Sequence, residues 1–365
     1  MKFVSGDRIF FLLVLSIALA GLAIFSSAAL GILVRESGSL SKDILLQSGL
    51  GFGLGLLALF SARAIPFAWI KRFAPYIYAI TLLFTMLVFV PGIGFHSGGA
   101  TRWIDIGFTT VQPAEFLKIG FVLALAWWLA PRARQLVHPK KGLIPFVAML
   151  ALPALILLAQ PNTSTTILLL ATGSVMYFAA GAPWRDFIIL ALIAIVALGS
   201  IVIARPYIKD RIMTFINPSA NSLGIGYQAQ QSLIAIGSGG LLGRGFGQGV
   251  EKFNYLPEPD GDSIFAVFAE ETGFVGALIL LALFVALSAR GIVIAGNSHD
   301  LFGGLIALGF SFMIILQAFI NMCSMLGIIP LTGLPLPFIS HGGTALMAAL
   351  IMCGFILNVA AHRKT

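Results

Sequence analysis

The stretch GSGGLLGRGFGQGVEKFNYLPEPDGDSIFAVFAEETGFVG, residues 237–276, joins a polar loop to a long apolar segment. Six of the chain's 14 acidic residues lie in it: Glu251, Glu258, Asp260, Asp262, Glu270 and Glu271. The rest of the chain is apolar, with 59% hydrophobic residues overall. Ionised groups in or near a membrane are costly to place and are usually functional. This stretch is therefore the first candidate for chemistry.

The composition indicates a membrane protein. Mean hydropathy is +1.00 and only 10% of residues are charged, against about a quarter in soluble domains. The net charge of +8 does not indicate nucleic-acid binding, because the basic residues lie in short loops between apolar runs, as orientation signals do. Cys323 and Cys353 lie in apolar runs without metal-ligand spacing, so we expect buried thiols, no disulfide and no zinc site.

Apolar runs of about the length of a bilayer core recur along the chain. They lie at Ile9–Val34, Asp43–Ala62, Pro75–Val90, Gln112–Ala130, Gly142–Leu158, Ser164–Gly181, Phe187–Ala204, Ser263–Ala289, Leu301–Leu326 and Ile339–Ala361. The first run is too long for a signal peptide and is interpreted as a retained helix. The fold class is thus an all-α polytopic membrane protein of about ten helices. We expect one membrane domain, 1–365, with a large loop at 205–262 between helices 7 and 8.

The lysines and arginines of the short loops set the expected orientation. Most of them fall in segments that are cytoplasmic if the N-terminus is cytoplasmic, as the positive-inside rule requires. The C-terminus is then cytoplasmic too. Loop 205–262, with its acidic cluster, is then extracytoplasmic.

Asp262 is the leading candidate for a general base. It directly precedes an apolar run, so its carboxylate should lie at the membrane surface near a helix N-terminus. A carboxylate in a partly apolar cleft suits the removal of a proton from a sugar hydroxyl. The alternative is that Asp262 only caps that helix, since Asp is a favoured cap residue.

Charged residues at two other places could bind substrate or serve structure. Glu115 and Lys118 are three apart on one helical face and could form an ion pair that holds helices together or take part in catalysis. Arg205 and Arg211 lie just outside the membrane. They could bind a diphosphate, or they could be a solvated surface patch.

Two further segments contain chain-breaking residues. Residues 321–347 carry Pro330, Pro335, Pro337 and a glycine pair, which indicates a re-entrant or cavity-lining segment. His341 in it is more typical of a hydrogen-bonded structural residue than of a metal ligand. The glycine-rich stretch 237–249 matches neither the dinucleotide nor the Walker pattern. It predicts a loop whose backbone is free to lie close to another group, which could be a neighbouring part of the protein.

Four ordered blocks resemble one family. They are TRWIDIGFTTVQPAEFLK (101–118), GYQAQQSLIAIGSGGLLGRGFGQG (226–249), YLPEPDGDSIFAVFAEETGF (255–274) and IIPLTGLPLPFISHGGTALM (328–347). Together they look like the SEDS family (FtsW/RodA/SpoVE), the cell-wall proteins of bacteria, and the likeness runs from the first helix to the last. KFNYLPE resembles the division member, FtsW, more than the elongation member, RodA.

The resemblance implies a peptidoglycan glycosyltransferase of the bacterial cytoplasmic (inner) membrane that polymerises lipid II on its outer face. It places the family's essential aspartate on Asp262. The substrate-binding candidates are Glu115, Lys118, Arg205, Arg211, Arg102, Glu258, Gln231, Ser238 and His341. A class B penicillin-binding protein transpeptidase and divisome or elongasome proteins are the implied partners. A divalent cation, magnesium or manganese, is an open cofactor expectation.

The sequence departs from the family pattern at three positions. Asn162 stands where an acid is frequent, Gly261 replaces a threonine, and His341 replaces a tyrosine. Asn162 cannot act as a base, and Asp260 stays a competitor of Asp262.

The resemblance and these residues together suggest a direct displacement. Asp262 would deprotonate the acceptor's C4 hydroxyl, which attacks the donor's anomeric carbon and inverts it, giving a β-1,4 bond. Arg205, Arg211, Lys118 or a divalent cation would stabilise the leaving diphosphate. The alternatives are a flippase for the lipid-linked precursor and a non-catalytic scaffold for a transpeptidase. The crowding of carboxylates at one membrane face favours the enzyme.

Overall fold

The computed structural model describes residues 7–35, 51–97, 100–107, 109–217 and 224–362. Each of the ten expected apolar runs overlaps a helix. These are α1 (Arg8–Arg35), α3 (Leu54–Ala64), α4 (Phe67–Met86), α5 (Pro113–Leu129), α6 (Leu143–Ala159), α7 (Thr163–Ala179), α8 (Trp184–Ala204), α12 (Ile264–Gly296), α13 (Leu301–Met325) and α14 (Gly343–Ala361). Two short 3₁₀ helices, η2 (Leu87–Phe89) and η3 (Ala130–Gln135), follow α4 and α5. The all-α polytopic membrane fold is confirmed.

Helix length alone does not establish ten membrane crossings. Within the described ranges, seven helices are long and apolar enough to cross a membrane, and α3, α6 and α7 are shorter apolar helices. The beginning of the second expected run, from Asp43, lies outside the described residues. A total of ten crossings therefore stays a prediction.

Three expected boundaries are wrong. Helix α4 begins at Phe67, eight residues before the expected Pro75, and includes that proline. Helix α12 extends to Gly296, past the expected Ala289, and α14 begins at Gly343, after the expected Ile339. Hydropathy marks the part of a helix inside the bilayer. A helix that projects into water, or an apolar segment in extended form, escapes that signal.

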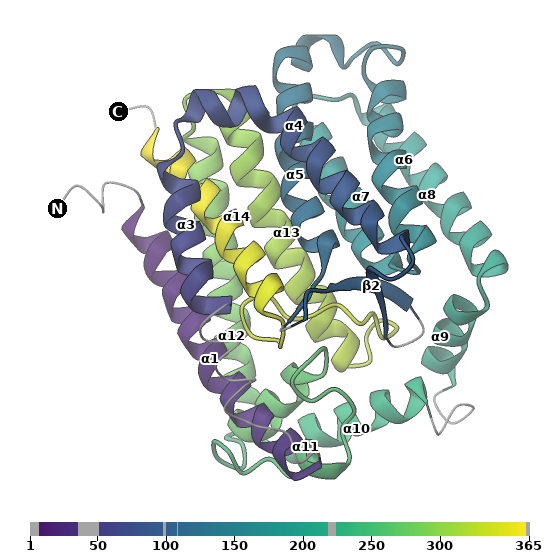
Figure 1. Cartoon of the computed structure of the whole chain (residues 1–365), viewed down its shortest axis with the longest axis vertical. Coiled ribbons are helices and arrows are strands. Elements are labelled where there is room, and N and C mark those ends of the chain that lie inside the picture. Colours follow the sequence, from purple (N-terminus) through teal and green to yellow (C-terminus); the bar gives the residue numbers. More distant parts are fainter. Residues whose placement is uncertain (1–6, 36–50, 98–99, 108, 218–223, 363–365) are drawn as a thin grey trace.

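The helices form a bundle in which α5, α13 and α14 are the most buried and α8 the most exposed. Figure 1 shows the start of α1 and the end of α14 at the same end of the bundle, the upper left. Helices α9 (Pro206–Ile216), α10 (Ile225–Ser238) and α11 (Glu251–Asn254) lie at the opposite end. The expected large loop is therefore partly helical.

A three-stranded antiparallel sheet also lies near that opposite end, and the sequence reading missed it. Its strands are β1 (Gly94–Ser97), β2 (Ala100–Asp105) and β3 (Thr110–Val111), in that order. β1 and β3 have only four and two residues, and the sequence of β2, ATRWID, does not alternate between apolar and polar residues. The sheet matters because β2 carries Arg102.

The glycine-rich stretch packs on a kink in α12. Gly273 has φ +70° inside that helix, and a Cβ there would lie 2.3 Å from the backbone nitrogen of Gly243. The amide N–H of Phe274 donates to Gly240 at 2.9 Å, and that of Val275 donates to Leu241 at 3.1 Å. The loop's close neighbour is thus the protein's own helix, one of the alternatives open from the sequence.

Candidate active site

Asp262 ends the loop that leads into α12. The Glu258 carbonyl accepts hydrogen bonds from the backbone N–H groups of Gly261 and Ser263 at 3.1 and 3.2 Å, which forms a tight turn around Asp262. Ser263, not Asp262, is the N-cap residue of α12. The Asp262 carboxylate instead accepts a hydrogen bond from Gln228 Nε2 at 3.0 Å. The structure thus gives the helix-cap interpretation of Asp262 no support.

The surroundings of Asp262 make it a better base. Burial, and after it the nearby charge of Glu258, raises the pKa of this carboxyl to about 6. The hydrogen bond from Gln228 and the charge of Arg211 oppose that rise in pKa. A general base works best with a pKa near the working pH. Asp262 fits that requirement.

Asp260, the competing carboxylate, is already engaged. Its Oδ2 lies 3.0 Å from Nδ1 of His341, and its carbonyl accepts the backbone N–H of the same histidine at 2.6 Å. The His341 ring stacks on Phe25 with a centroid distance of 5.5 Å. His341 thus ties the segment after Phe338 to the acidic loop, in agreement with a structural histidine. These contacts favour Asp262 as the base.

Arg211 faces Asp262 across Gly333. A Cβ built on Gly333 would lie 3.7 Å from Arg211 Nη2 and 3.7 Å from Asp262 Oδ2. The guanidinium is held by the carbonyls of Leu331 and Thr332, to which Nη1 donates at 3.0 and 3.1 Å. The expected cavity-lining segment therefore does line the site.

The same segment is fixed to the start of α12 by one amide. Nδ2 of Asn321, on α13, donates to the carbonyls of Asp262 and Leu334, both at 2.8 Å. Asn321 is fully buried. It therefore sets the position of the carboxylate relative to Gly333.

Arg102 brings a second guanidinium to this region. It donates to the carbonyls of Gln160, at 3.3 Å, and Pro161. Burial lowers its pKa, and so does the charge of Arg211. The Tyr207 hydroxyl also donates to Pro161, at 3.3 Å. Both guanidinium groups are held by neutral carbonyls among the described residues, which leaves their positive charge to act on nearby anions, including Asp262 in the case of Arg211.

Glu115 and Lys118 form a buried ion pair 2.7 Å apart. Lys118 Nζ also donates to Gln317 at 2.9 Å, and Gln317 donates to the Pro335 carbonyl at 2.9 Å. The pair borders a small cavity beside Pro335 and Phe338. It therefore supports the proline-rich segment from the side of α5 and is neutralised internally.

Three other candidates lie apart from Asp262 in their contacts. Arg205 is exposed at the junction of α8 and α9. Ser238 donates to Ala235 within its own helix at 2.9 Å. Gln231 is half-buried on α10, and the structure records no hydrogen bond of it with a described residue.

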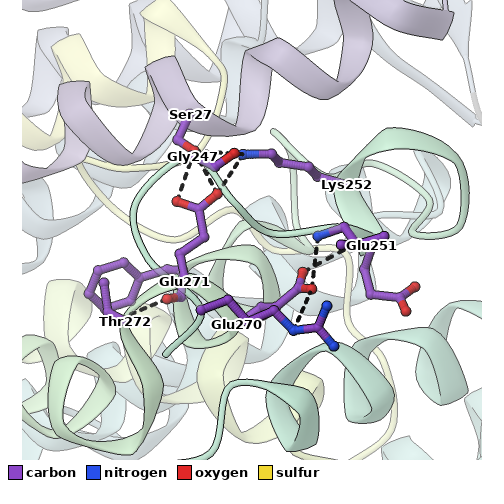
Figure 2. Close-up of polar contacts among 10 residues, drawn as sticks. Ser27, Gly247, Glu251, Lys252, Glu270, Glu271 and Thr272 are labelled. Carbon is purple, nitrogen blue, oxygen red and sulfur yellow. Dashed lines mark hydrogen bonds and ion pairs between the residues drawn. The ribbon is translucent and has the colours of Figure 1, made fainter. Parts of the chain in front are cut away.

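Glu270 and Glu271 hold the loop to α12 (Figure 2). Glu271 pairs with Lys252 at 2.5 Å and accepts a hydrogen bond from Ser27 of α1 at 2.7 Å. Glu270 accepts the backbone N–H groups of Val250 and Glu251 at 2.9 and 3.3 Å. Both glutamates are buried, and these contacts hold the loop against α12.

The comparisons with known proteins agree with this geometry. The family model described as "Cell cycle protein" (FtsW/RodA/SpoVE) matches residues 7–365. This chain belongs to the FtsW/RodA/SpoVE family. It is 37% identical over 86% of its length to stage V sporulation protein E of Bacillus subtilis, covering 85% of that protein. It is 36% identical to a probable peptidoglycan glycosyltransferase FtsW of Alcanivorax borkumensis, over 95% of this chain and 91% of that one.

A solved structure extends the FtsW/RodA/SpoVE likeness to three dimensions. It is titled "Structural coordination of polymerization and crosslinking by a peptidoglycan synthase complex" and matches with a TM-score of 0.80 at 28% identity. The match covers 98% of both chains. This chain and the chain of that solved structure therefore share one fold over almost their whole lengths.

The family departure at Asn162 has a structural explanation. Asn162 is the N-cap of α7, and its side chain accepts the backbone N–H of Thr165 at 3.3 Å. It follows directly on Pro161, whose carbonyl holds Arg102. Asn162 therefore orders this turn without adding a negative charge beside Arg102.

The sequence reading missed four residues of this site: Tyr207, Gln228, Asn321 and Gly333. Gln228 is one of several polar residues of α10, so its side chain was visible in the sequence but its contact with Asp262 was not. Asn321 and Gly333 act through approaches between α13, α12 and the proline-rich segment. Neither has a sequence signal on its own.

Proposed function

We propose that this protein is a peptidoglycan glycosyltransferase that polymerises lipid II, with Asp262 as general base. The observation that carries the proposal is the pair of Asp262 and Arg211 on either side of Gly333. A base and a cation this close together suit a reaction in which a proton leaves the acceptor hydroxyl while negative charge develops on the leaving diphosphate. The curated FtsW relative is named as a probable glycosyltransferase of this kind, which supports the assignment.

In the proposed reaction the Asp262 carboxylate takes the proton of the acceptor's C4 hydroxyl on N-acetylglucosamine. The electron pair left on that oxygen forms a bond to the anomeric carbon of the donor's N-acetylmuramic acid. The bond from that carbon to the diphosphate breaks on the opposite face, and undecaprenyl diphosphate leaves. The anomeric centre is inverted, so an α-linked donor gives a β-1,4 bond.

Arg211 and Arg102 are the proposed partners of the leaving diphosphate. Guanidinium groups bind phosphate oxygens through paired hydrogen bonds. Lys118 is neutralised by Glu115 at 2.7 Å, which makes it a weaker choice. Fixed cations of this kind stabilise charge that develops in the transition state.

A divalent cation, magnesium or manganese, stays an expectation for this site. The described residues contain no group of three or more His, Cys, Asp or Glu side chains that could hold a metal ion. A magnesium ion bound mainly through substrate phosphates needs only one or two protein carboxylates. A requirement for such an ion is tested by chelation and readdition of magnesium or manganese during lipid II polymerisation.

We further propose a position in the cell for this activity. The positive-inside rule favours cytoplasmic termini and an extracytoplasmic Asp262 in the cytoplasmic membrane. A class B penicillin-binding protein would be the partner, because the structural relative belongs to a complex that couples polymerization and crosslinking. The division machinery is preferred over the elongation machinery. Complementation of strains depleted for each pathway would test that preference.

The decisive experiment is lipid II polymerisation by the purified protein, alone and with its transpeptidase. Wild type should make glycan chains, while Asp262→Ala and Asp262→Asn should bind lipid II without polymerising it. Normal polymerisation by folded Asp262 variants would overturn the assignment of the base. Transport of lipid II across proteoliposomes without polymerisation would replace the enzyme with a flippase. Activity only in the partner would leave this chain as a scaffold.

A further inference from the structure

A cavity of about 360 Å³ lies at the end of the bundle opposite α9, α10 and α11. It is lined by Phe67 at the beginning of α4, by residues 298–300 between α12 and α13, and by Val359 and His362 at the end of α14. The rings of Phe67 and His362 have centroids 5.5 Å apart. Figure 1 shows the beginning of α4 and the end of α14 at this same end. The cavity is therefore separate from the candidate active site.

The charged groups at this cavity favour an anion. Lys71, on α4, pairs with Asp300 at 3.6 Å, and its side chain is still 52% exposed. Asp300 lines the cavity and also accepts the backbone N–H of Gly303 at 2.9 Å, as the N-cap of α13. The Asp300 carboxylate is therefore already engaged. An ammonium group has three N–H donors, so Lys71 can bind a further acceptor.

Two histidines add polar groups to the cavity. His362 Nδ1 contacts the Asn358 carbonyl at 2.9 Å. Because a carbonyl only accepts, Nδ1 carries the proton, which leaves Nε2 for a ligand. His299 is exposed. Among the described residues, no three His, Cys, Asp or Glu side chains are placed to hold a metal ion, so these imidazoles beside Lys71 suit a phosphate better than a metal.

The outer face of α4 next to the cavity lies toward lipid. Trp69, Phe73 and Tyr76 are three or four residues apart, on one side of the helix, and they are 61%, 42% and 63% exposed. Aromatic rings of this kind are enriched where a membrane meets water. Arg72 lies among them, with its guanidinium carbon 5.8 Å from the centre of the Phe73 ring. The cavity therefore adjoins an aromatic and basic surface typical of the level of lipid headgroups.

We propose that this cavity binds the phosphate headgroup of an anionic phospholipid. Lys71 and His299 donate to the phosphate, while Phe67 and Val359 cover the glycerol part of the lipid. The acyl chains then run along the exposed face of α4. Basic pockets between membrane helices bind such headgroups, and the positive charge at this cavity complements them. The site is independent of the polymerisation proposed above.

Photo-crosslinking at two positions of α4 tests the site. Benzoylphenylalanine replaces Phe67, in the cavity, and in a control protein Tyr76, on the lipid-facing side of the same helix. Each full-length protein is illuminated in nanodiscs of equal phosphatidylglycerol and phosphatidylcholine, with a radiolabel on one lipid or the other. At Phe67 we expect about fivefold more label from phosphatidylglycerol, the contribution of one basic residue near a membrane surface. At Tyr76 the two lipids should label equally.

Two outcomes would overturn the proposal. Equal labelling by the two lipids at Phe67 would make the cavity an ordinary lipid contact. Excess inorganic phosphate should leave the phosphatidylglycerol label in place, because the acyl chains hold the lipid in the bilayer; loss of the label would assign the cavity to a soluble phosphate compound instead. Should the Phe67 protein fail to fold, Ser298 is a second cavity position for the crosslinker, with the same expected result.

Charge variants of the crosslinking protein test the donors. Lys71→Gln should reduce the preference to equal labelling, whereas Lys141→Gln, which removes an exposed lysine between η3 and α6, should leave it unchanged. Asp300→Asn keeps a favoured N-cap residue and removes negative charge, so it should raise the preference for phosphatidylglycerol. A preference that Lys71→Gln leaves unchanged, or that Asp300→Asn lowers in a folded protein, would overturn the assignment of an anionic headgroup.

Discussion

Gly333→Ala should abolish most activity while leaving the protein folded. Gly333 has φ +66°, and its missing Cβ leaves open the space between Arg211 Nη2 and Asp262 Oδ2, each 3.7 Å away. A methyl group there would occupy the space through which reacting groups approach the base. A displacement of reacting atoms by about 1 Å can cost about 10²-fold in rate. We therefore expect a fall of about 10²-fold in lipid II polymerisation.

The loss must be separated from backbone strain. An alanine with positive φ costs roughly 1–2 kcal/mol relative to glycine. Gly327 is a matched control, because its φ is also +66° and it begins the same segment. A Cβ on Gly327 would meet only the Leu233 side chain, at 3.6 Å. Gly327→Ala should therefore lose similar stability and keep its activity.

Thermal unfolding and polymerisation are measured on both variants in parallel. Equal losses of activity at equal losses in Tm would refute the argument, since strain alone would then explain the result. A fully active Gly333→Ala protein would refute it more directly. In that case the reacting groups would not pass between Asp262 and Arg211.

Three other perturbations test neighbouring parts of the site. Burial and the charge of Glu258 raise the pKa of Asp262 to about 6, so the rate of polymerisation should fall below about pH 6 as the base becomes protonated. Glu258→Gln should move the midpoint of that fall to lower pH, because it removes a negative charge near Asp262. An unmoved midpoint would contradict the assignment. Lys252→Met should destabilise the protein by about 3–5 kcal/mol by leaving buried Glu271 unpaired, and Lys252→Met with Glu271→Leu should recover much of that loss in chemical denaturation. Asn162→Ala should cost about 1 kcal/mol as a lost helix cap, whereas Asn162→Asp should retain the cap; a loss of unfolding free energy in the Asp variant as large as that in the Ala variant would contradict the capping role.

The helical membrane fold could be predicted because its signal is local. A run of about twenty apolar residues has the length of a helix that spans the bilayer core, so each run can be recognised without knowing its neighbours. The same local logic identified Asp262, since a carboxylate directly before such a run must lie near the membrane surface. Glu115 and Lys118 were likewise expected on one helical face, and the structure places them 2.7 Å apart.

The rest of the site depends on contacts between distant segments. Gln228, on α10, donates a hydrogen bond to Asp262. Arg102 lies on β2, whose sequence has no alternating apolar and polar pattern. Gly333 lies beside Asp262 because Asn321 of α13 bonds both segments. Such positions are set by packing across the bundle, which no periodicity in the sequence records. Fold-level patterns could therefore find the base but not its surroundings.

The four candidate cationic side chains differ in the groups that already contact them. Lys118 is neutralised by Glu115 inside the bundle, and Arg205 is exposed at the junction of α8 and α9. Arg211 and Arg102 are held by backbone carbonyls, which orient a guanidinium without removing its charge. Because Asn162 adds no carboxylate next to Arg102, that positive charge is not reduced. A diphosphate that develops charge beside Asp262 would find its strongest fixed partner in Arg211, with Arg102 behind it.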